Sequence, residues 1–231
     1  MMRPFFVICA GLALAACTTV TSPPATAPAP GNASNAAPIN SFSAVVARVE
    51  PVAEQVCRER APRLNCDFEI FVDRRAGLPA NAFQTVDRNG RPIIGFTASL
   101  VAELRNRDEL AFILGHEAAH HIAGHLSRQR DTALRGALVA GILAGIGGGN
   151  AGDVRSAQEV GATVGARVYS KEFELEADAL GTVIAYRAGF NPSIGALFFT
   201  RIADPGNQFL GTHPPNAQRI QTVQRTLETL R

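Results

Sequence analysis

The chain has 231 residues, of which 46% are hydrophobic and 18% charged, and a formal net charge of +2. This length fits one domain with appendages, and this balance excludes a wholly disordered chain. Lys and Arg form only short runs, such as residues 128–130, and tryptophan is absent. We therefore expect no nucleic-acid partner.

Residues 1–16 are typical of an export signal. Arg3 gives a positive start, and the apolar run of residues 5–14 is too short to span a bilayer. Cys17 follows two alanines, which resembles the lipobox of bacterial lipoproteins, where the cysteine becomes lipidated and starts the mature chain. The alternative is an ordinary cleaved signal followed by an unrelated cysteine. Thr18 is not the aspartate that commonly retains lipoproteins in the inner membrane, so the resemblance implies the periplasmic face of the outer membrane.

Residues 17–40 follow the signal as an expected tether. They are rich in Pro, Ala, Ser and Thr and have almost no large apolar side chain, so they cannot build a core. In a polyproline II conformation such a segment extends by about 3.1 Å per residue. The tether would therefore separate the lipid anchor from a single folded domain, residues 41–231.

Two cysteines remain once the signal is removed and Cys17 carries lipid. Cys57 and Cys66 form an even pair in an oxidising compartment, which favours a disulfide over two free thiols. No close C-x-x-C spacing indicates a metal site here. We expect the disulfide to join the first helix of the domain to the strand that follows it.

The domain begins with an expected helix and three expected strands. Residues 41–60 carry valines at helical spacing, with Pro51 as a candidate kink. Residues 66–73 alternate apolar and polar side chains, as a half-buried strand does. Residues 81–86 and 92–97 flank an Asn-Gly pair, which is a strong hairpin signal. The predicted fold class is α+β, mostly helical with a small antiparallel sheet. Seven more helices are expected, over residues 98–106, 108–126, 132–148, 154–169, 171–188, 193–203 and 216–230.

The segment of residues 133–152 is apolar and rich in glycine. Its apolar run is only about half as long as a membrane span. We expect a buried hairpin of close-packed helices. The alternative is a segment that dips into a membrane, which the shortness of the run disfavours.

The stretch His116-Glu117-Ala118-Ala119-His120 holds the most informative local motif. On an α-helix, residues four apart lie on one face, so both imidazoles can reach one ion. Two neutral histidines suit zinc, which needs a third protein ligand if a water is to complete a tetrahedron. Glu117 lies about 100° around the helix from His116, where its carboxylate can accept a proton from that water. The alternative is a surface helix with polar residues in chance order, which the apolar stretch before the motif opposes.

A second motif downstream supplies the missing ligand. Glu174 and Asp178 lie four apart on an apolar helical pattern. One carboxylate can be the third zinc ligand, and the other can accept the remaining N–H of a zinc-bound histidine. The alternative is a solvated acidic face, which we expect for Glu172 and Glu176.

Three stretches together resemble a known family: "LGHEAAHHIAGH", "YSKEFELEADALG" and "GTHPPNAQRI". They are similar, in order and spacing, to the zinc metallopeptidases that include the HtpX heat-shock protease and the CAAX prenyl protease, and in particular to the minigluzincins, periplasmic lipoproteins of outer-membrane quality control. The resemblance implies an edge strand that lines the active-site cleft and pairs with an extended substrate. It also implies the roles of five residues: His116, His120 and Glu174 bind one zinc ion, Glu117 is the general base, and Asp178 supports a ligand.

The other three histidines are less clearly placed. His121 and His125 are also four apart, but Ile122 follows His121 where a base would be required. We expect His121 to be a peripheral helix residue and His125, about 140° around the helix from His120, to make a structural hydrogen bond. His213 precedes two prolines in a stiff loop. We favour a role for His213 in the cleft, as a donor to the developing oxyanion or as a reversible plug on the zinc, over a loop residue that packs the last helix.

The predicted function is a zinc-dependent endopeptidase acting on unfolded or misassembled envelope proteins, with the outer-membrane protein assembly machinery as a candidate partner. The alternative is a latched, chaperone-like assembly factor for outer-membrane proteins. A purely structural zinc domain is disfavoured, because Glu117 would be unneeded and only three protein ligands are present. A prenyl-protein protease is disfavoured because no transmembrane helices surround the motifs.

Overall fold

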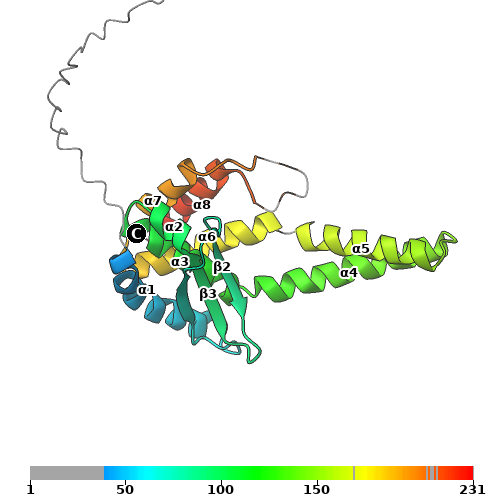
Figure 1. Cartoon of the computed structure of the whole chain (residues 1–231), viewed down its shortest axis with the longest axis horizontal. Helices are drawn as coiled ribbons and strands as arrows, with labels where there is room; N and C mark the ends of the chain where they lie inside the picture. The colour runs from blue at the N-terminus through cyan, green and yellow to red at the C-terminus, as the bar shows by residue number, and fades with distance from the viewer. Residues whose placement is uncertain (1–38, 169, 207, 209–210, 212, 231) are drawn as a thin grey trace, which may run out of the picture. The chain divides into compact units, whose positions relative to one another are not determined.

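A computed structural model of the chain describes residues 39–168, 170–206, 208, 211 and 213–230 (Figure 1). The export signal, Cys17 and most of the tether lie outside the described residues, so the interpretations given for them stay predictions. The buried core runs from Phe42 to Leu227, within the compact unit of residues 34–231. Because this unit contains its own core, it can fold without the residues before it.

Helix α1 (Ile39–Arg60) covers one side of the domain with a stripe of buried side chains. The helix runs through Pro51, which lies on its exposed face. Its last turns carry Cys57, which forms the expected disulfide with Cys66, just before the first strand. The buried stripe follows the helical repeat and consists of Val45, Val49, Ala53 and Val56.

The sheet has three strands, β1 (Glu69–Asp73), β2 (Ala82–Val86) and β3 (Pro92–Thr97), in the order β1-β3-β2. Strands β2 and β3 form the expected antiparallel hairpin, and Gly90 of its Asn-Gly turn has a φ of 79°. The sheet is mixed rather than wholly antiparallel, because β1 pairs with β3 in parallel. The apolar β3 takes the central, most buried position, so the chain crosses from β1 to the far edge before it returns.

The helices that follow form most of the domain. Helix α2 (Ala98–Glu103) leads into α3 (Arg107–Ile122), which packs against α1, the sheet and α6 (Ser170–Arg187). Helix α3 begins where the Asn106 side chain accepts a hydrogen bond from Glu109 N, and nearly all its residues are buried. The short α7 (Pro192–Gly195), the 3₁₀ helix η1 (Ala196–Thr200) and α8 (Asn216–Glu228) complete the domain.

Several helix boundaries differ from the prediction, and the largest difference lies between residues 122 and 132. The expected helix over residues 108–126 ends early, at Ile122, and α4 (His125–Ile146) begins directly afterwards instead of at residue 132. The break lies at Gly124, which has a φ of 66°. Glycine adopts this left-handed conformation without a Cβ clash, so it can end one helix and redirect the chain into the next.

Helices α4 and α5 (Ala151–Val168) form the expected hairpin of close-packed helices. The prediction that this hairpin is buried is wrong. Glycines lie along its contact face, and its larger apolar side chains point outwards: Leu138 is 61% exposed and Ile146 80% exposed. Within the described residues, no helix has the length and apolar character needed to cross a membrane.

Candidate metal centre

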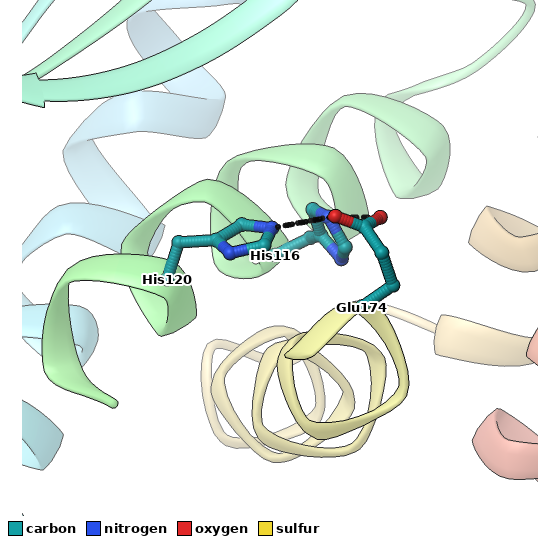
Figure 2. Close-up of side chains that lie close together, drawn as sticks. All are labelled: His116, His120 and Glu174. Carbon is teal, nitrogen blue, oxygen red and sulfur yellow. Dashed lines mark hydrogen bonds and ion pairs between the residues drawn. The ribbon is translucent and has the colours of Figure 1, made fainter. Parts of the chain in front are cut away.

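Three side chains from two helices converge at one point (Figure 2). His116 and His120 come from α3 and Glu174 from α6, and one ligand atom from each lies within 4.8 Å of the others. The two histidine Nε2 atoms are 3.0 Å apart. Glu174 places one carboxylate oxygen 3.6 Å from His116 Nε2 and the other 3.4 Å from His120 Nε2.

This donor set fits zinc. Zinc bonds to histidine nitrogen and carboxylate oxygen are about 2.0–2.2 Å long, which places neighbouring donors of a tetrahedron about 3.3 Å apart. The three measured separations lie on both sides of that value. Two imidazoles and one carboxylate leave a fourth position free, as catalytic rather than structural zinc sites do.

Two glycines allow the ligand-bearing helices to approach so closely. A Cβ on Gly115 would lie 2.8 Å from the carbonyl oxygen of Gly181, and a Cβ on Gly181 would lie 2.7 Å from the amide nitrogen of His116. Helices α3 and α6 are therefore in backbone contact directly beside the first ligand. Any larger residue at either position must push the two helices apart.

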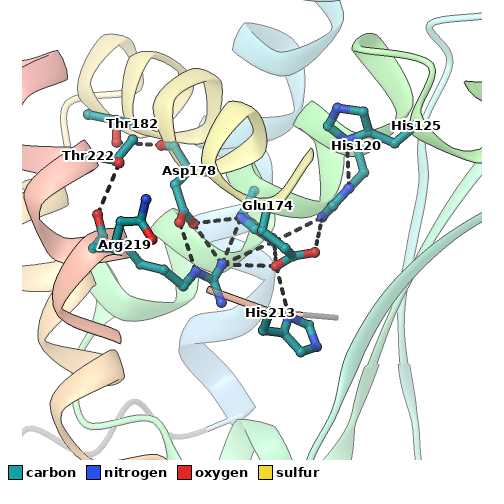
Figure 3. A network of polar contacts seen from close by, with 10 residues as sticks. His120, His125, Glu174, Asp178, Thr182, His213, Arg219 and Thr222 are labelled. Atoms are coloured by element: carbon teal, nitrogen blue, oxygen red, sulfur yellow. Dashed lines mark hydrogen bonds and ion pairs between the residues drawn. The ribbon is translucent and has the colours of Figure 1, made fainter. Parts of the chain in front are cut away.

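Asp178 and Arg219 contact each other next to Glu174 (Figure 3), and both also lie against His116. Asp178 is fully buried, and its Oδ1 lies 3.0 Å from His116 Nδ1. With the proton on Nδ1 donated to Asp178, Nε2 of His116 is free to bind a metal. Arg219 donates from Nε and Nη2 to the two oxygens of Asp178, at 2.8 and 2.7 Å, and its Nη2 lies 3.3 Å from Glu174.

Sequence reasoning missed Arg219. The signal was present in α8, where Arg219 lies on the buried stripe with Thr222, Val223 and Leu227. A lone arginine on the buried face of an amphipathic helix requires a buried acidic partner. Asp178, already assigned to a metal ligand, was the available acid.

The second histidine ligand is held by a chain of side chains on its other side. His120 Nδ1 lies 2.8 Å from His125 Nδ1, and His125 Nε2 lies 3.1 Å from Glu176. Burial lowers the pKa of His125 to about 4 despite its bond to Glu176. The neutral His125 can therefore accept from His120 and donate to Glu176, which also accepts from Arg128 at 2.7 Å. The His125 ring stacks on Phe173.

Two sequence-based expectations need correction here. Glu176 is not simply solvated, because it pairs with both His125 and Arg128 although it is half exposed. His121 is not peripheral but buried. Its Nε2 donates to the Asn65 carbonyl at 2.7 Å and its ring meets Phe68 edge-on. The structural hydrogen bond expected of His125 is confirmed.

A pocket of about 640 Å³ surrounds the candidate ligands His116, His120 and Glu174. Glu117 lines it and is itself buried. Burial raises the pKa of Glu117, although His116 and His120 oppose this shift. Residues of the edge strand β2, Ala82 and Gln84, form part of its wall.

His213 faces the same pocket. Its Nδ1 lies 3.1 Å from the Glu174 oxygen that also faces His116, and its side chain is 53% exposed. Burial raises the pKa of Glu174, but hydrogen bonds from His116, His120 and His213 have a larger, opposite effect. They hold the pKa of Glu174 well below its usual range. Burial likewise lowers the pKa of His116, but Asp178 and Glu174 raise it overall to about 9. Glu174 is therefore held as a carboxylate, and together with Asp178 it stabilises positive charge on His116.

Comparison with known proteins agrees with this geometry. The sequence model of peptidase family M48 matches residues 43–227, which include every element from α1 to α8 that contributes to the centre. No curated protein matches the chain significantly.

Proposed function

We infer that this chain, which belongs to peptidase family M48, the zinc metalloendopeptidases, cleaves extended segments of unfolded or misassembled proteins of the bacterial envelope. Hydrolysis of peptide bonds follows from family membership together with the His116, His120 and Glu174 cluster. The single observation that carries the catalytic assignment is the position of Glu117. This buried carboxylate lines the same pocket as the three ligands without being one of them.

In the proposed mechanism, His116, His120 and Glu174 would hold the metal. Zinc, when bound, lowers the pKa of a coordinated water and polarises the scissile carbonyl. Glu117 accepts a proton from the attacking water and delivers it to the leaving amine. Burial raises the pKa of Glu117, which brings a carboxylate closer to the value at which a base both accepts and returns a proton near neutral pH.

The edge strand supports an extended substrate. In the part of the chain that the structure describes, β2 pairs only with β3, so its other edge can receive a further strand. Gln84 of this strand lines the pocket beside the candidate ligands. Most backbone groups inside a folded domain are already hydrogen-bonded, so an extended segment with a free backbone is more common in unfolded or misassembled clients.

The role of His213 has two versions. We propose that its imidazole donates to the oxyanion that develops on the scissile carbonyl. The contact between His213 and Glu174 also favours the second candidate function, a latched chaperone-like factor in which His213 restrains the metal ligand. The two versions predict opposite changes in activity when His213 is removed. An enzyme that uses His213 for catalysis should become slower, whereas an enzyme that His213 holds inactive should become faster.

The location is proposed from sequence alone. Cys17, after its two alanines, would be lipidated and would anchor the domain at the periplasmic face of the outer membrane through the tether. This position would bring the pocket close to misassembled outer-membrane proteins and to their assembly machinery.

Degradation of casein by the chain from residue 18 onwards tests the proposal. Wild type should cleave, whereas Glu117→Gln should lower the rate by about 10²–10⁴-fold and retain one zinc ion per chain. Glu172→Gln, on the exposed face of α6, is the matched control and should behave as wild type. Full activity of Glu117→Gln would contradict the assignment of the base.

Failure of the zinc-loaded wild type to cleave would favour the latched alternative. His213→Ala then separates the two versions. The latched protein should gain activity with this substitution, whereas an enzyme that uses His213 for the oxyanion should lose kcat with little change in zinc affinity.

A further inference from the structure

One face of α4 is apolar and exposed along most of its length. Leu134, Leu138, Ile142 and Ile146 recur every fourth residue, so they form a band that turns by about 40° around the helix at each step. Val139 and Leu143 widen this band to about half of the helix circumference. These six residues, here called the α4 outer face, are between 51% and 80% exposed. The band from residue 134 to residue 146 is about 18 Å long.

In the hairpin, small residues lie between the helices and large apolar residues point to the outside, whereas helices in water usually bury their large apolar residues. A Cβ on Gly136 would overlap the backbone of Gly161, and a Cβ on Gly165 would overlap that of Thr132, so small residues fill the contact between α4 and α5. Large apolar residues lie on the outside. Small residues between helices and large apolar residues around them are the arrangement of helices in lipid.

The positions of charged residues on the hairpin restrict the orientation in which it could contact lipid. Arg135 is the last charged residue of α4, and residues 136–152 carry no charge. Helix α5, by contrast, has Asp153 and Arg155 near the tip and Glu159 beyond them. Insertion tip first would bury these charges, whereas contact along the side of α4 would not.

We propose that the α4 outer face docks on the surface of a lipid bilayer, with α4 lying in the membrane plane. The proposed membrane anchor supports this inference but is not required for it. Between Cys17 and Ile39 the chain can span about 70 Å when extended, so the anchor keeps the hairpin within reach of the bilayer and raises its effective concentration there. Lipid contact through α4, in addition to the tether, would fix the orientation of the pocket relative to the membrane.

Vesicle flotation tests the proposal. The probe is a vesicle of phosphatidylethanolamine and phosphatidylglycerol, mixed with the chain from residue 18 onwards, which lacks the lipidated cysteine and keeps the whole folded unit. Wild type should float with the vesicles. The triple variant Leu138→Ser/Ile142→Ser/Ile146→Ser should partition more than about tenfold less. The matched control removes three apolar side chains exposed elsewhere, Leu64→Ser/Ile194→Ser/Leu197→Ser, and should float as wild type does.

A second measurement does not depend on the triple variant folding. The chain has no tryptophan, so Ile142→Trp introduces a unique fluorophore on the α4 outer face and Leu197→Trp one elsewhere. Vesicles should shift the emission of the first to shorter wavelength and leave the second unchanged. Absence of the shift, or wild type that does not float, overturns the proposal.

Two further outcomes are distinguishable. A wild-type dimer that the triple variant converts into a monomer, with no vesicle binding, would assign the α4 outer face to a second copy of the chain and overturn the proposal. Casein cleavage without vesicles reports on the proposed function alone. Because the tested chain carries no lipid, failure of the predicted lipidation would not affect the vesicle result.

Discussion

Two helix pairs of this protein use the same packing device with opposite results. Helices α3 and α6 touch through Gly115 and Gly181, and α4 and α5 touch through Gly136 and Gly161. The first pair buries nearly all of α3 and most of α6. In the second pair, α5 has no buried residue.

The difference shows that close helix contact alone does not make a core. Glycine fixes how near two helices lie, whereas burial of the remaining faces depends on further layers. Helix α1, the sheet and α7 cover α3, and α8 covers α6. Nothing among the described residues covers the α4 outer face. The covered pair therefore provides fixed positions for the candidate metal ligands, and the uncovered pair provides the surface that we propose for lipid.

The largest expected effect on the free energy of unfolding comes from Ile→Ala substitutions in the two helix pairs, one in each pair. Ile184 of α6 is 0% exposed, and Ile142 of α4 is 51% exposed. Ile184→Ala should lower the free energy of unfolding by about 2–5 kcal/mol, because it removes buried methyl groups and leaves a cavity. Ile142→Ala should change it by less than about 0.5 kcal/mol. Urea unfolding of both variants measures the difference, and similar losses would show that α4 is covered after all.

The next largest effect is expected when the contact glycine of each helix pair is replaced by alanine. Gly181→Ala should lower the free energy of unfolding by about 1–3 kcal/mol, because its Cβ would meet the backbone of His116. Zinc affinity should fall with it, since the ligands of α3 and α6 move apart. Gly161→Ala should loosen only the hairpin and leave zinc affinity unchanged. Competition with a chelator measures zinc affinity, and amide exchange measures the hairpin. If zinc affinity is unchanged in Gly181→Ala, the distance between helices α3 and α6 does not determine how well the centre binds zinc.

The covered pair was largely predictable from sequence. His116, His120, Glu174 and Asp178 follow the helical repeat, so their shared faces could be worked out from spacing. Burial then forces such polar groups to find partners. Arg219 was missed because its partner lies 41 residues away, and spacing within one helix says nothing about contacts between distant helices.

The uncovered pair was predictable only in part. The apolar composition of residues 133–152 indicated helices, and their glycines indicated close packing. The same composition suits a buried hairpin and an exposed one, because burial depends on neighbours that the segment itself does not specify. The parallel pairing of β1 was hidden for a similar reason, since strand order depends on where the loop between β1 and β2 crosses.

A smaller loss of stability than that of Ile184→Ala or Gly181→Ala is expected at His125, where the two pairs meet. His125 is the first residue of α4, yet its ring bonds to His120 of α3 and to Glu176 of α6. His125→Ala should cost about 1 kcal/mol in unfolding but weaken zinc binding by about 10–100-fold, because His120 loses the partner that fixes its tautomer and ring orientation. Ser127→Ala, two residues further along α4, should leave zinc affinity unchanged. Chelator competition and thermal unfolding of both variants give the two readings. A His125→Ala protein that binds zinc like wild type would show that the contact only packs α4 against α6, and that the hairpin begins independently of the metal centre.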